Sequence, residues 1–133
     1  MNPSGLVLVV EDSPSAIKSI RESLEAMGVP HRIMSQVDEV DRFRITGWIP
    51  GEDEGPFSLA WSQVRILFCD YQIGGSFSGG DVVENASFGG VGQIIGMSSS
   101  AGLNRRMLAA GAQIAEEKHR VIHGIGSGRW RLT

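Results

Sequence analysis

The sequence predicts an α/β domain in which helices cover both faces of a parallel sheet. Continuous apolar runs at residues 5–10, 64–69 and 92–97 are typical of strands buried on both faces. Segments with helical spacing separate these runs, and such alternation of strand and helix produces a parallel, doubly wound sheet. The chain has 133 residues, of which 41% are hydrophobic, so we expect one domain over residues 1–133.

The first strand, at residues 5–10, is followed by a well-marked helix. Ser13 and Pro14 suit the N-cap and first helical positions, and Gly28 supplies a stop. Between them the apolar residues recur at helical spacing, as Ile17, Ile20, Leu24 and Met27. This segment therefore predicts an amphipathic helix.

The next stretch predicts a strand, a helix and a long loop. Residues 31–36 have the pattern of a short strand. Residues 37–45 favour a helix, because Val37, Val40 and Phe43 or Arg44 fall near one face. Residues 46–63 combine turn formers, a small acidic cluster and two tryptophans, which indicates an insertion or long loop. Within that loop we expect the tryptophans to anchor the chain to the core, and these are Trp48 and Trp61.

The second half of the chain repeats the alternation. Further strands are expected at residues 64–69, 92–97 and 113–118, with helices at 79–86 and 103–112. The end of the chain, residues 120–133, predicts only a poor helix. Gly124, Gly126 and Gly128 lie there, and glycine costs a helix about 1 kcal/mol relative to alanine.

Polar residues stand where the predicted strands end, at the edge of a parallel sheet that binds ligands. Glu11, Asp12 and Asp70 would repel one another there unless a divalent cation held them. Mg²⁺ fits, because it takes carboxylates, carbonyl oxygens and waters. An aspartate beside Mg²⁺ is also a competent nucleophile toward a phosphoryl group. Ser98 and Lys118 offer a hydroxyl group and a positive charge to the remaining phosphoryl oxygens.

Four segments at these strand ends carry a resemblance to a known family. "LVLVVEDSPS" resembles the first strand and acidic pair of the CheY-like receiver domains of response regulators, and "ILFCD" resembles their phosphoacceptor strand. "IIGMSS" is similar to the strand that ends in the family's hydroxyl residue, and "LAAGAQIAEEK" to the helix end that leads to its lysine. The match runs from Leu6 to Lys118. It implies the flavodoxin-like fold, with five parallel strands in the order 2-1-3-4-5.

The resemblance also implies roles. Asp70 would be the phosphoacceptor, Ser98 the switch hydroxyl and Lys118 the phosphoryl-sensing lysine. Mg²⁺ would be held by Glu11, Asp12, Asp70 and the backbone carbonyl of Gln72. The expected partners are a histidine kinase or histidine phosphotransfer protein as donor and a downstream protein as target. Such a domain is a phosphoacceptor in two-component signal transduction rather than an enzyme.

Several positions depart from the family pattern. Gly74 stands where a proline is usual, in a glycine-rich loop that we expect to be mobile. His119 replaces the proline that makes a cis bond after the lysine, so a trans bond or an altered loop is expected, since a non-proline cis bond costs about 2.5–4 kcal/mol. Ala115 replaces the aromatic switch residue. The usual output face, formed by the fourth helix, fifth strand and fifth helix, is therefore atypical.

Two other functions stay open. A pseudo-receiver would keep the fold as an interaction module without regulated phosphorylation, and the atypical positions favour it. The four-part site favours a phosphorylated receiver instead. A small phosphatase or other hydrolase that uses the same aspartate is a weaker alternative, because no added general base or substrate-binding cap is evident.

The composition and the two ends of the sequence indicate the compartment and the partners of the protein. The net charge of −3 argues against a DNA-binding protein, and the single cysteine, Cys69, fits a reducing cytoplasm. The apolar run at the N-terminus is too short for a signal peptide or a membrane span. Ile122, Ile125 and Trp130 in a poorly helical tail would need a cover, so we expect the tail to support a homodimer.

Overall fold

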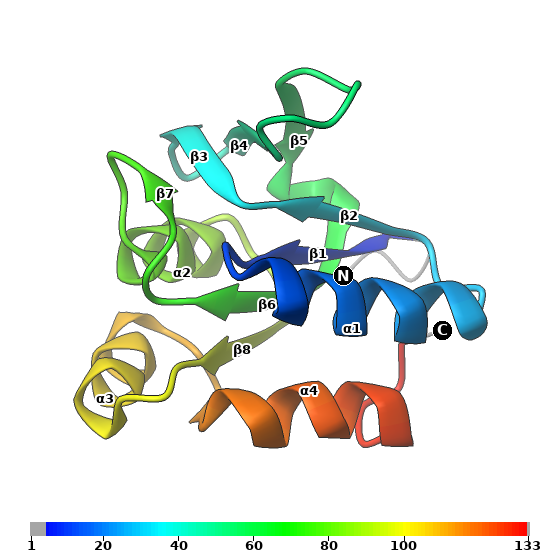
Figure 1. The fold of residues 1–133 in the computed structure, drawn as a ribbon. Coiled ribbons are helices and arrows are strands. Elements are labelled where there is room, and N and C mark those ends of the chain that lie inside the picture. Colours follow the sequence, from blue (N-terminus) through cyan, green and yellow to red (C-terminus); the bar gives the residue numbers. More distant parts are fainter. Residues whose placement is uncertain (1–4, 133) are drawn as a thin grey trace.

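A parallel sheet forms the centre of the computed structural model, which describes residues 5–132 (Figure 1). The elements in chain order are β1 (Leu6–Val10), α1 (Pro14–Ala26), β2 (His31–Met34), β3 (Gln36–Val40), β4 (Arg44–Trp48), β5 (Phe57–Ala60), the short 3-10 helix η1 (Trp61–Gln63), β6 (Val64–Asp70), β7 (Gly74–Gly75), α2 (Gly79–Phe88), β8 (Gln93–Met97), α3 (Ala101–Ala110), β9 (Ile114–Glu116) and α4 (Lys118–Ser127).

The central sheet has five strands in the order β2-β1-β6-β8-β9. All of its strand pairs are parallel. Counted along this sheet, the order is 2-1-3-4-5, so the predicted fold class is confirmed. Parallel strands all present their carboxyl ends at one edge, where β1, β6 and β8 stop beside each other.

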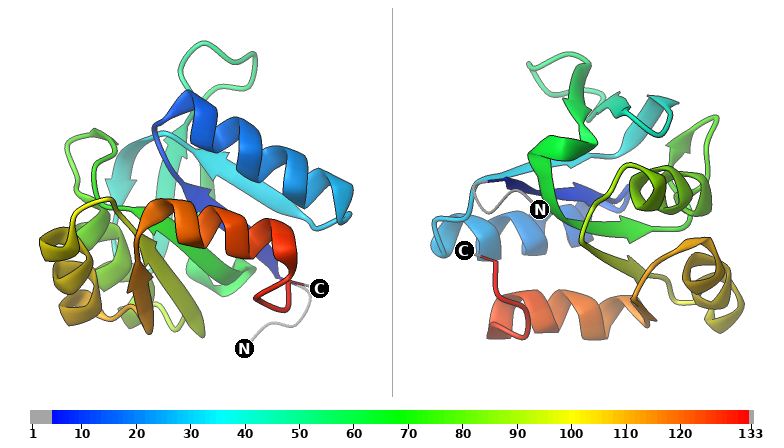
Figure 2. Two further views of the ribbon diagram at one scale, coloured as in Figure 1. Left: turned by 60° about the horizontal axis from the view of Figure 1, so that its bottom comes forward. Right: turned by 180° about the vertical axis from the view of Figure 1, so that it is seen from behind.

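Helices cover both faces of this sheet. On one face α1 and α4 lie side by side, as Figure 1 and the left view of Figure 2 show. They enclose an apolar core with one set of strand side chains, which includes Val9, Phe68 and Met97. The opposite face carries α2 and α3 together with a second, smaller sheet, and its core includes Leu8, Leu67 and Ile94. Alternate residues of each central strand therefore enter different cores, as burial on both faces requires.

The second sheet replaces the helix that residues 37–45 predict. β3 and β4 form an antiparallel hairpin there, and β5 pairs with the other side of β4. The Asp41 carboxylate closes the turn, since it accepts the N–H groups of Phe43 and Arg44 at 2.7 and 3.0 Å. Val37 and Ile45 are fully buried against the main core. The helix prediction was wrong because the hairpin buries these residues just as well.

Residues 46–63 are also more regular than a long loop. They contain the end of β4, all of β5 and η1. Trp61 anchors this segment as predicted: it is almost fully buried, and its Nε1 donates to the Asp41 carbonyl at 2.8 Å. Trp48 is half-buried.

The loop after Asp70 adds a further short strand to the second sheet. β7, which is Gly74–Gly75, pairs in parallel with the start of β3. Gly75 has a φ of +98°, and a Cβ there would clash with the Val37 carbonyl. The backbone at Gly74 and Gly75 is thus paired, while mobility of the glycine-rich loop stays a prediction.

The C-terminal segment also differs from its prediction, which was a poor helix. Residues Lys118–Ser127 form a ten-residue helix, and Gly128 ends it with a left-handed φ of 79°. Gly124 lies against the Trp130 ring, where a Cβ would come within 2.8 Å of Cζ3. Trp130 packs edge-on against Phe68, with ring centroids 5.3 Å apart. The glycine that weakens the helix locally makes room for an aromatic anchor. No helix within residues 5–132 is long and apolar enough to cross a bilayer.

Candidate functional site at the carboxyl edge of the sheet

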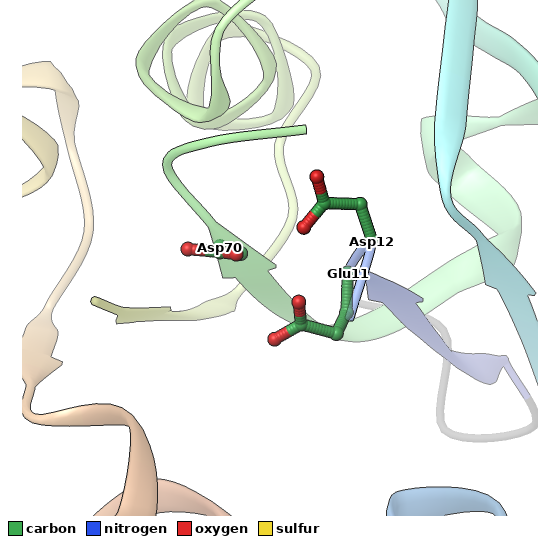
Figure 3. Close-up of side chains that lie close together, drawn as sticks. All are labelled: Glu11, Asp12 and Asp70. Atoms are coloured by element: carbon green, nitrogen blue, oxygen red, sulfur yellow. The ribbon is translucent and has the colours of Figure 1, made fainter. Parts of the chain in front are cut away.

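Three carboxylates meet where β1 and β6 end. Glu11 and Asp12 directly follow β1, and Asp70 is the last residue of β6. One oxygen of each lies within 4.8 Å of one oxygen of the others, and Figure 3 shows the three side chains turned toward one space. Glu11 and Asp70 are buried, whereas Asp12 is exposed. The structure thus brings together the acids that the sequence places at strand ends.

Lys118 joins two of these carboxylates. Its Nζ lies 2.9 Å from Asp70 Oδ2 and 3.0 Å from Glu11 Oε1. It is the first residue of α4 rather than the end of a strand, because β9 stops at Glu116. Glu117 caps the helix by accepting the Arg120 N–H at 3.2 Å. That cap fixes the start of α4 and, with it, the position of the lysine.

The buried charges perturb one another. Burial raises the pKa of Glu11, and the neighbouring Asp70 charge adds to the effect. Asp12 is largely exposed, yet its pKa is also raised, first by the partial burial of its carboxylate and then by the Asp70 charge. Burial acts to lower the pKa of Lys118, but its hydrogen bonds to Asp70 and Glu11 outweigh burial, so that pKa is raised. One ammonium group thus faces three carboxylates, which leaves negative charge at the site.

The donor set fits Mg²⁺. Glu11 Oε2 accepts the Ser13 N–H at 3.0 Å and a hydrogen bond from Lys118 at 3.3 Å. Glu11 Oε1 is buried and touches the ammonium group, yet it accepts no hydrogen bond from any residue in the described range 5–132. A buried carboxylate oxygen without a hydrogen bond, beside two further carboxylates, suits a hard divalent cation. Gln72 lies in the loop after β6, and its carbonyl as a fourth ligand stays a prediction.

Ser98 follows β8 at the same edge and is buried. Its N–H donates to the Glu116 carbonyl at 3.2 Å, and its Oγ accepts the Ser100 N–H at 3.1 Å. Within residues 5–132 it makes no hydrogen bond to Asp70 or Lys118. The sequence therefore places Ser98 at the correct edge, while its hydroxyl group is held by its own loop.

Sequence reasoning missed two residues of this region. Gly79, the first residue of α2, lies so close to β6 that a Cβ would clash with the Asp70 carbonyl. Its only sequence signal is the Gly-Gly pair after the helix cap Ser78. Asn104 on α3 is buried and donates from Nδ2 to the Ser98 carbonyl at 2.9 Å. A single asparagine inside a helical segment gives no signal for that role.

The cysteine next to the acceptor position is fully enclosed. The Cys69 thiol donates to the Asp70 carbonyl at 3.2 Å and contacts the Gly79 carbonyl at 3.7 Å. Burial, followed by the charges of Asp70 and Glu11, raises the pKa of this thiol well above its ordinary value. Cys69 is therefore a protonated packing residue.

Two departures from the family pattern are visible in the structure. No cis peptide bond occurs within residues 5–132, which confirms the expected trans bond before His119. Ala115 leaves room beside Ser98. A cavity of about 450 Å³ lies there, lined in part by Ser98, Asn104, Leu108 and Ala115. No aromatic ring from residues 5–132 lines this cavity, where the family has its switch residue.

Comparison with known proteins identifies the fold. No protein-family model matches the sequence, and no curated protein does. Among solved structures, a CheY-like receiver domain protein from Methanospirillum hungatei is 17% identical, with a TM-score of 0.58 over 93% of this chain and 92% of that one. Vibrio cholerae chemotaxis protein CheY4 is 13% identical, with a TM-score of 0.61 over 97% and 98%.

A third similar structure contains ligands. It is a response regulator protein from Burkholderia pseudomallei with a phosphorylated aspartic acid, a calcium ion and citrate. It is 12% identical to this chain, with a TM-score of 0.56 over 94% of this chain and 71% of that one. The fold of this protein is thus that of CheY-like response-regulator receiver domains, with a second sheet in place of one helix.

Proposed function

We propose that this protein is a two-component receiver that accepts a phosphoryl group on Asp70 with the help of Mg²⁺. One observation carries the proposal. In a receiver fold, a buried aspartate ends the central strand, contacts a lysine at 2.9 Å and faces two further acids. This arrangement supports phosphoryl transfer better than simple packing, because three carboxylates in one place cost folding energy unless they serve a ligand.

The chemistry follows from the contacts. An Asp70 carboxylate oxygen attacks the phosphorus atom of a phosphohistidine, a P–O bond forms, and the P–N bond to the histidine breaks. The electron pair of that bond leaves with the imidazole. Lys118 is held beside Asp70 and pairs with a phosphoryl oxygen. Mg²⁺, when bound by Glu11, Asp12 and Asp70, neutralises charge on the transferring group.

The proposed partners are a histidine kinase or histidine phosphotransfer protein and an unidentified downstream protein, in the cytoplasm. Receiver domains are generally regulatory, so we propose a regulatory role rather than an enzymatic one. A homodimer stays a prediction, but the argument for it, an apolar tail in need of a cover, no longer holds. Ile125 and Trp130 are buried within the chain itself.

A pseudo-receiver is the second candidate, and the cavity beside Ala115 favours it. A ring that moves between two positions is a means of reporting phosphorylation, and this chain has an alanine there. Phosphorylation could then occur without the usual output. Labelling together with a structural readout separates the two candidates.

The test is incubation with Mg²⁺ and acetyl phosphate, followed by intact-mass measurement. We expect one added phosphoryl group on the parent protein and on Asp53→Asn, a control in an exposed loop. Asp70→Asn should gain none. NMR spectra with beryllofluoride should then show shifts around Ser98. Labelling that persists in Asp70→Asn would disprove the acceptor assignment, and labelling without shifts at Ser98 would favour the pseudo-receiver.

A separate test addresses the metal. Millimolar Mg²⁺ should raise the unfolding temperature, because it binds only the folded site. The double variant Glu11→Gln with Asp12→Asn should lose this dependence while keeping the fold. Equal stabilisation of parent and variant would exclude these ligands.

A further inference from the structure

Arg65 is a half-buried arginine at the end of the molecule opposite Asp70, and one nitrogen of its guanidinium group is buried without a partner within residues 5–132. It is the second residue of β6, and Asp70 is the last, so the two lie about 17 Å apart along one strand. Arg65 Nη2 is buried and has no hydrogen-bond partner within residues 5–132. Arginine stays protonated in proteins, and a buried donor without a partner is costly. A carboxylate from outside the described chain would satisfy it.

A cavity lies beside this guanidinium group. It has a volume of about 450 Å³, and Arg65 lines it with Trp61, Gln63 and the turn Gly89, Gly90 and Gly92. Gly89 lets the turn lie against the Trp61 ring, since a Cβ there would come within 2.5 Å of Trp61 Cδ1. The side wall is therefore aromatic and glycine-rich. A cavity of this size accommodates an entering side chain with its carboxylate.

Two exposed phenylalanines lie next to the cavity lining. Phe88 is 74% exposed and directly precedes Gly89, while Phe43 is 68% exposed and its carbonyl accepts the Trp61 N–H at 3.0 Å. They are the most exposed large apolar side chains in the described part of the chain. Exposed aromatic groups around a polar pocket are typical of a protein contact surface.

The charges near Phe43 indicate the sign of the charge that a partner would carry. Arg42 and Arg44 flank Phe43 and are exposed, and neither forms an ion pair within residues 5–132. The adjacent Asp41 carboxylate is occupied by the N–H groups of the turn. Arg42 and Arg44 act on the Asp41 charge only without a close ion pair, so together with Arg65 they leave an excess of positive charge there.

We propose that this region, the Arg65 surface, binds an acidic segment of a partner protein that also carries apolar side chains. The Arg65 surface comprises Arg42, Phe43, Arg44, Trp61, Arg65, Phe88, Gly89, Gly90 and Gly92. A carboxylate of the segment pairs with Arg65 in the cavity, and its apolar side chains cover Phe43 and Phe88. The binding needs neither Mg²⁺ nor a phosphoryl group, so it is independent of the function proposed for Asp70.

The test is an NMR titration of the full chain without Mg²⁺. The probe is a capped peptide of alternating leucine and glutamate, and the control peptide has glutamine in place of glutamate. We expect the glutamate peptide to shift the Arg65 Nε–H and the amides of Gly90 and Gly92 with millimolar or tighter affinity. The glutamine peptide should bind at least tenfold more weakly. Equal binding of both peptides, no binding, or shifts confined to other regions would overturn the proposal.

Variants make the test specific. Arg65→Met should lose the preference for glutamate and unfold at the same or a higher temperature, because it removes a buried guanidinium nitrogen that has no hydrogen-bond partner. Phe88→Ser should weaken both peptides, whereas Arg105→Gln, at an exposed position on α3, should change neither. Clear destabilisation by Arg65→Met would mean that the guanidinium group has a partner within the chain, which contradicts the proposal. Sodium acetate that binds as tightly as the peptide would indicate a small-anion site instead.

Discussion

Replacement of Lys118 by methionine tests how the acidic site is held together. The side chain of Glu11 is fully buried, that of Asp70 is 5% exposed, and Lys118 is their shared cation. Removing one partner of a buried ion pair typically costs about 3–5 kcal/mol, because the remaining charge stays buried. Lys118→Met should therefore lower the free energy of unfolding substantially in metal-free buffer.

Protonation limits the share of this loss that comes from Glu11. Glu11 can take up a proton instead of remaining charged, and this costs about 1.36 kcal/mol for each pH unit above its ordinary pKa of 4.5. Its share is thus at most about 3.4 kcal/mol at pH 7 and about 0.7 kcal/mol at pH 5. The destabilisation by Lys118→Met should shrink as the pH falls.

Urea unfolding at several pH values with a metal chelator measures this dependence. Lys18→Met is the matched control, because Lys18 has an 80% exposed side chain on α1 and only a weak contact with Glu22 at 3.9 Å. We expect the control to change stability by less than about 0.5 kcal/mol at every pH. A loss for Lys118→Met that is equally small at pH 7, or that does not vary with pH, would refute this account of the site.

Three further predictions concern the same fold. Burial raises the pKa of Glu11 above its ordinary 4.5, so the folded state keeps that proton to a higher pH than the unfolded state. The free energy of unfolding should therefore fall as the pH rises from 4.5 through the folded pKa. Glu11→Gln should remove this fall in urea unfolding without metal. Gly79→Ala should destabilise by about 1–3 kcal/mol through its clash with the Asp70 carbonyl, whereas Gly55→Ala, with open space around it, should not. Trp130→Ala should cost about 3–5 kcal/mol in thermal or urea unfolding, and a loss below about 1 kcal/mol would show that the tail does not anchor α4.

The central sheet was predictable because its strands are buried on both faces. Continuous apolar runs such as residues 5–10 and 64–69 need no partner information to be recognised. The acidic site followed for the same reason, since topology places strand ends at one edge. Gly79 and Asn104 escaped prediction because their roles depend on contacts between elements.

The second sheet could not be recognised by periodicity. The pairing of β3 with β4 shifts register between Val37 and Glu39, and this irregularity breaks the alternation that marks a strand. Val37 and Val40 then coincide with helical spacing by chance. The turn signal was present in Asp41, whose carboxylate accepts two N–H groups, but an aspartate is also common in helices' first turns.

The C-terminal helix shows packing overriding local preference. Gly124 and Gly126 lower helix propensity, yet Val121 and Ile125 bury their side chains in the core shared with α1. The benefit of placing Trp130 against Gly124 appears only in three dimensions. A propensity argument therefore undervalues this segment.

The buried thiol of Cys69 can report local opening of the structure. It is the single cysteine of the chain, its side chain is fully buried, and its thiol donates to the backbone of the residue proposed to be phosphorylated. A thiol reagent can reach it only when β6 and α2 separate, so the labelling rate measures how often this region opens. Ligands that tighten the acidic edge will slow labelling without any engineered probe. The opening rate around the central strand can thus be measured in the unmodified protein.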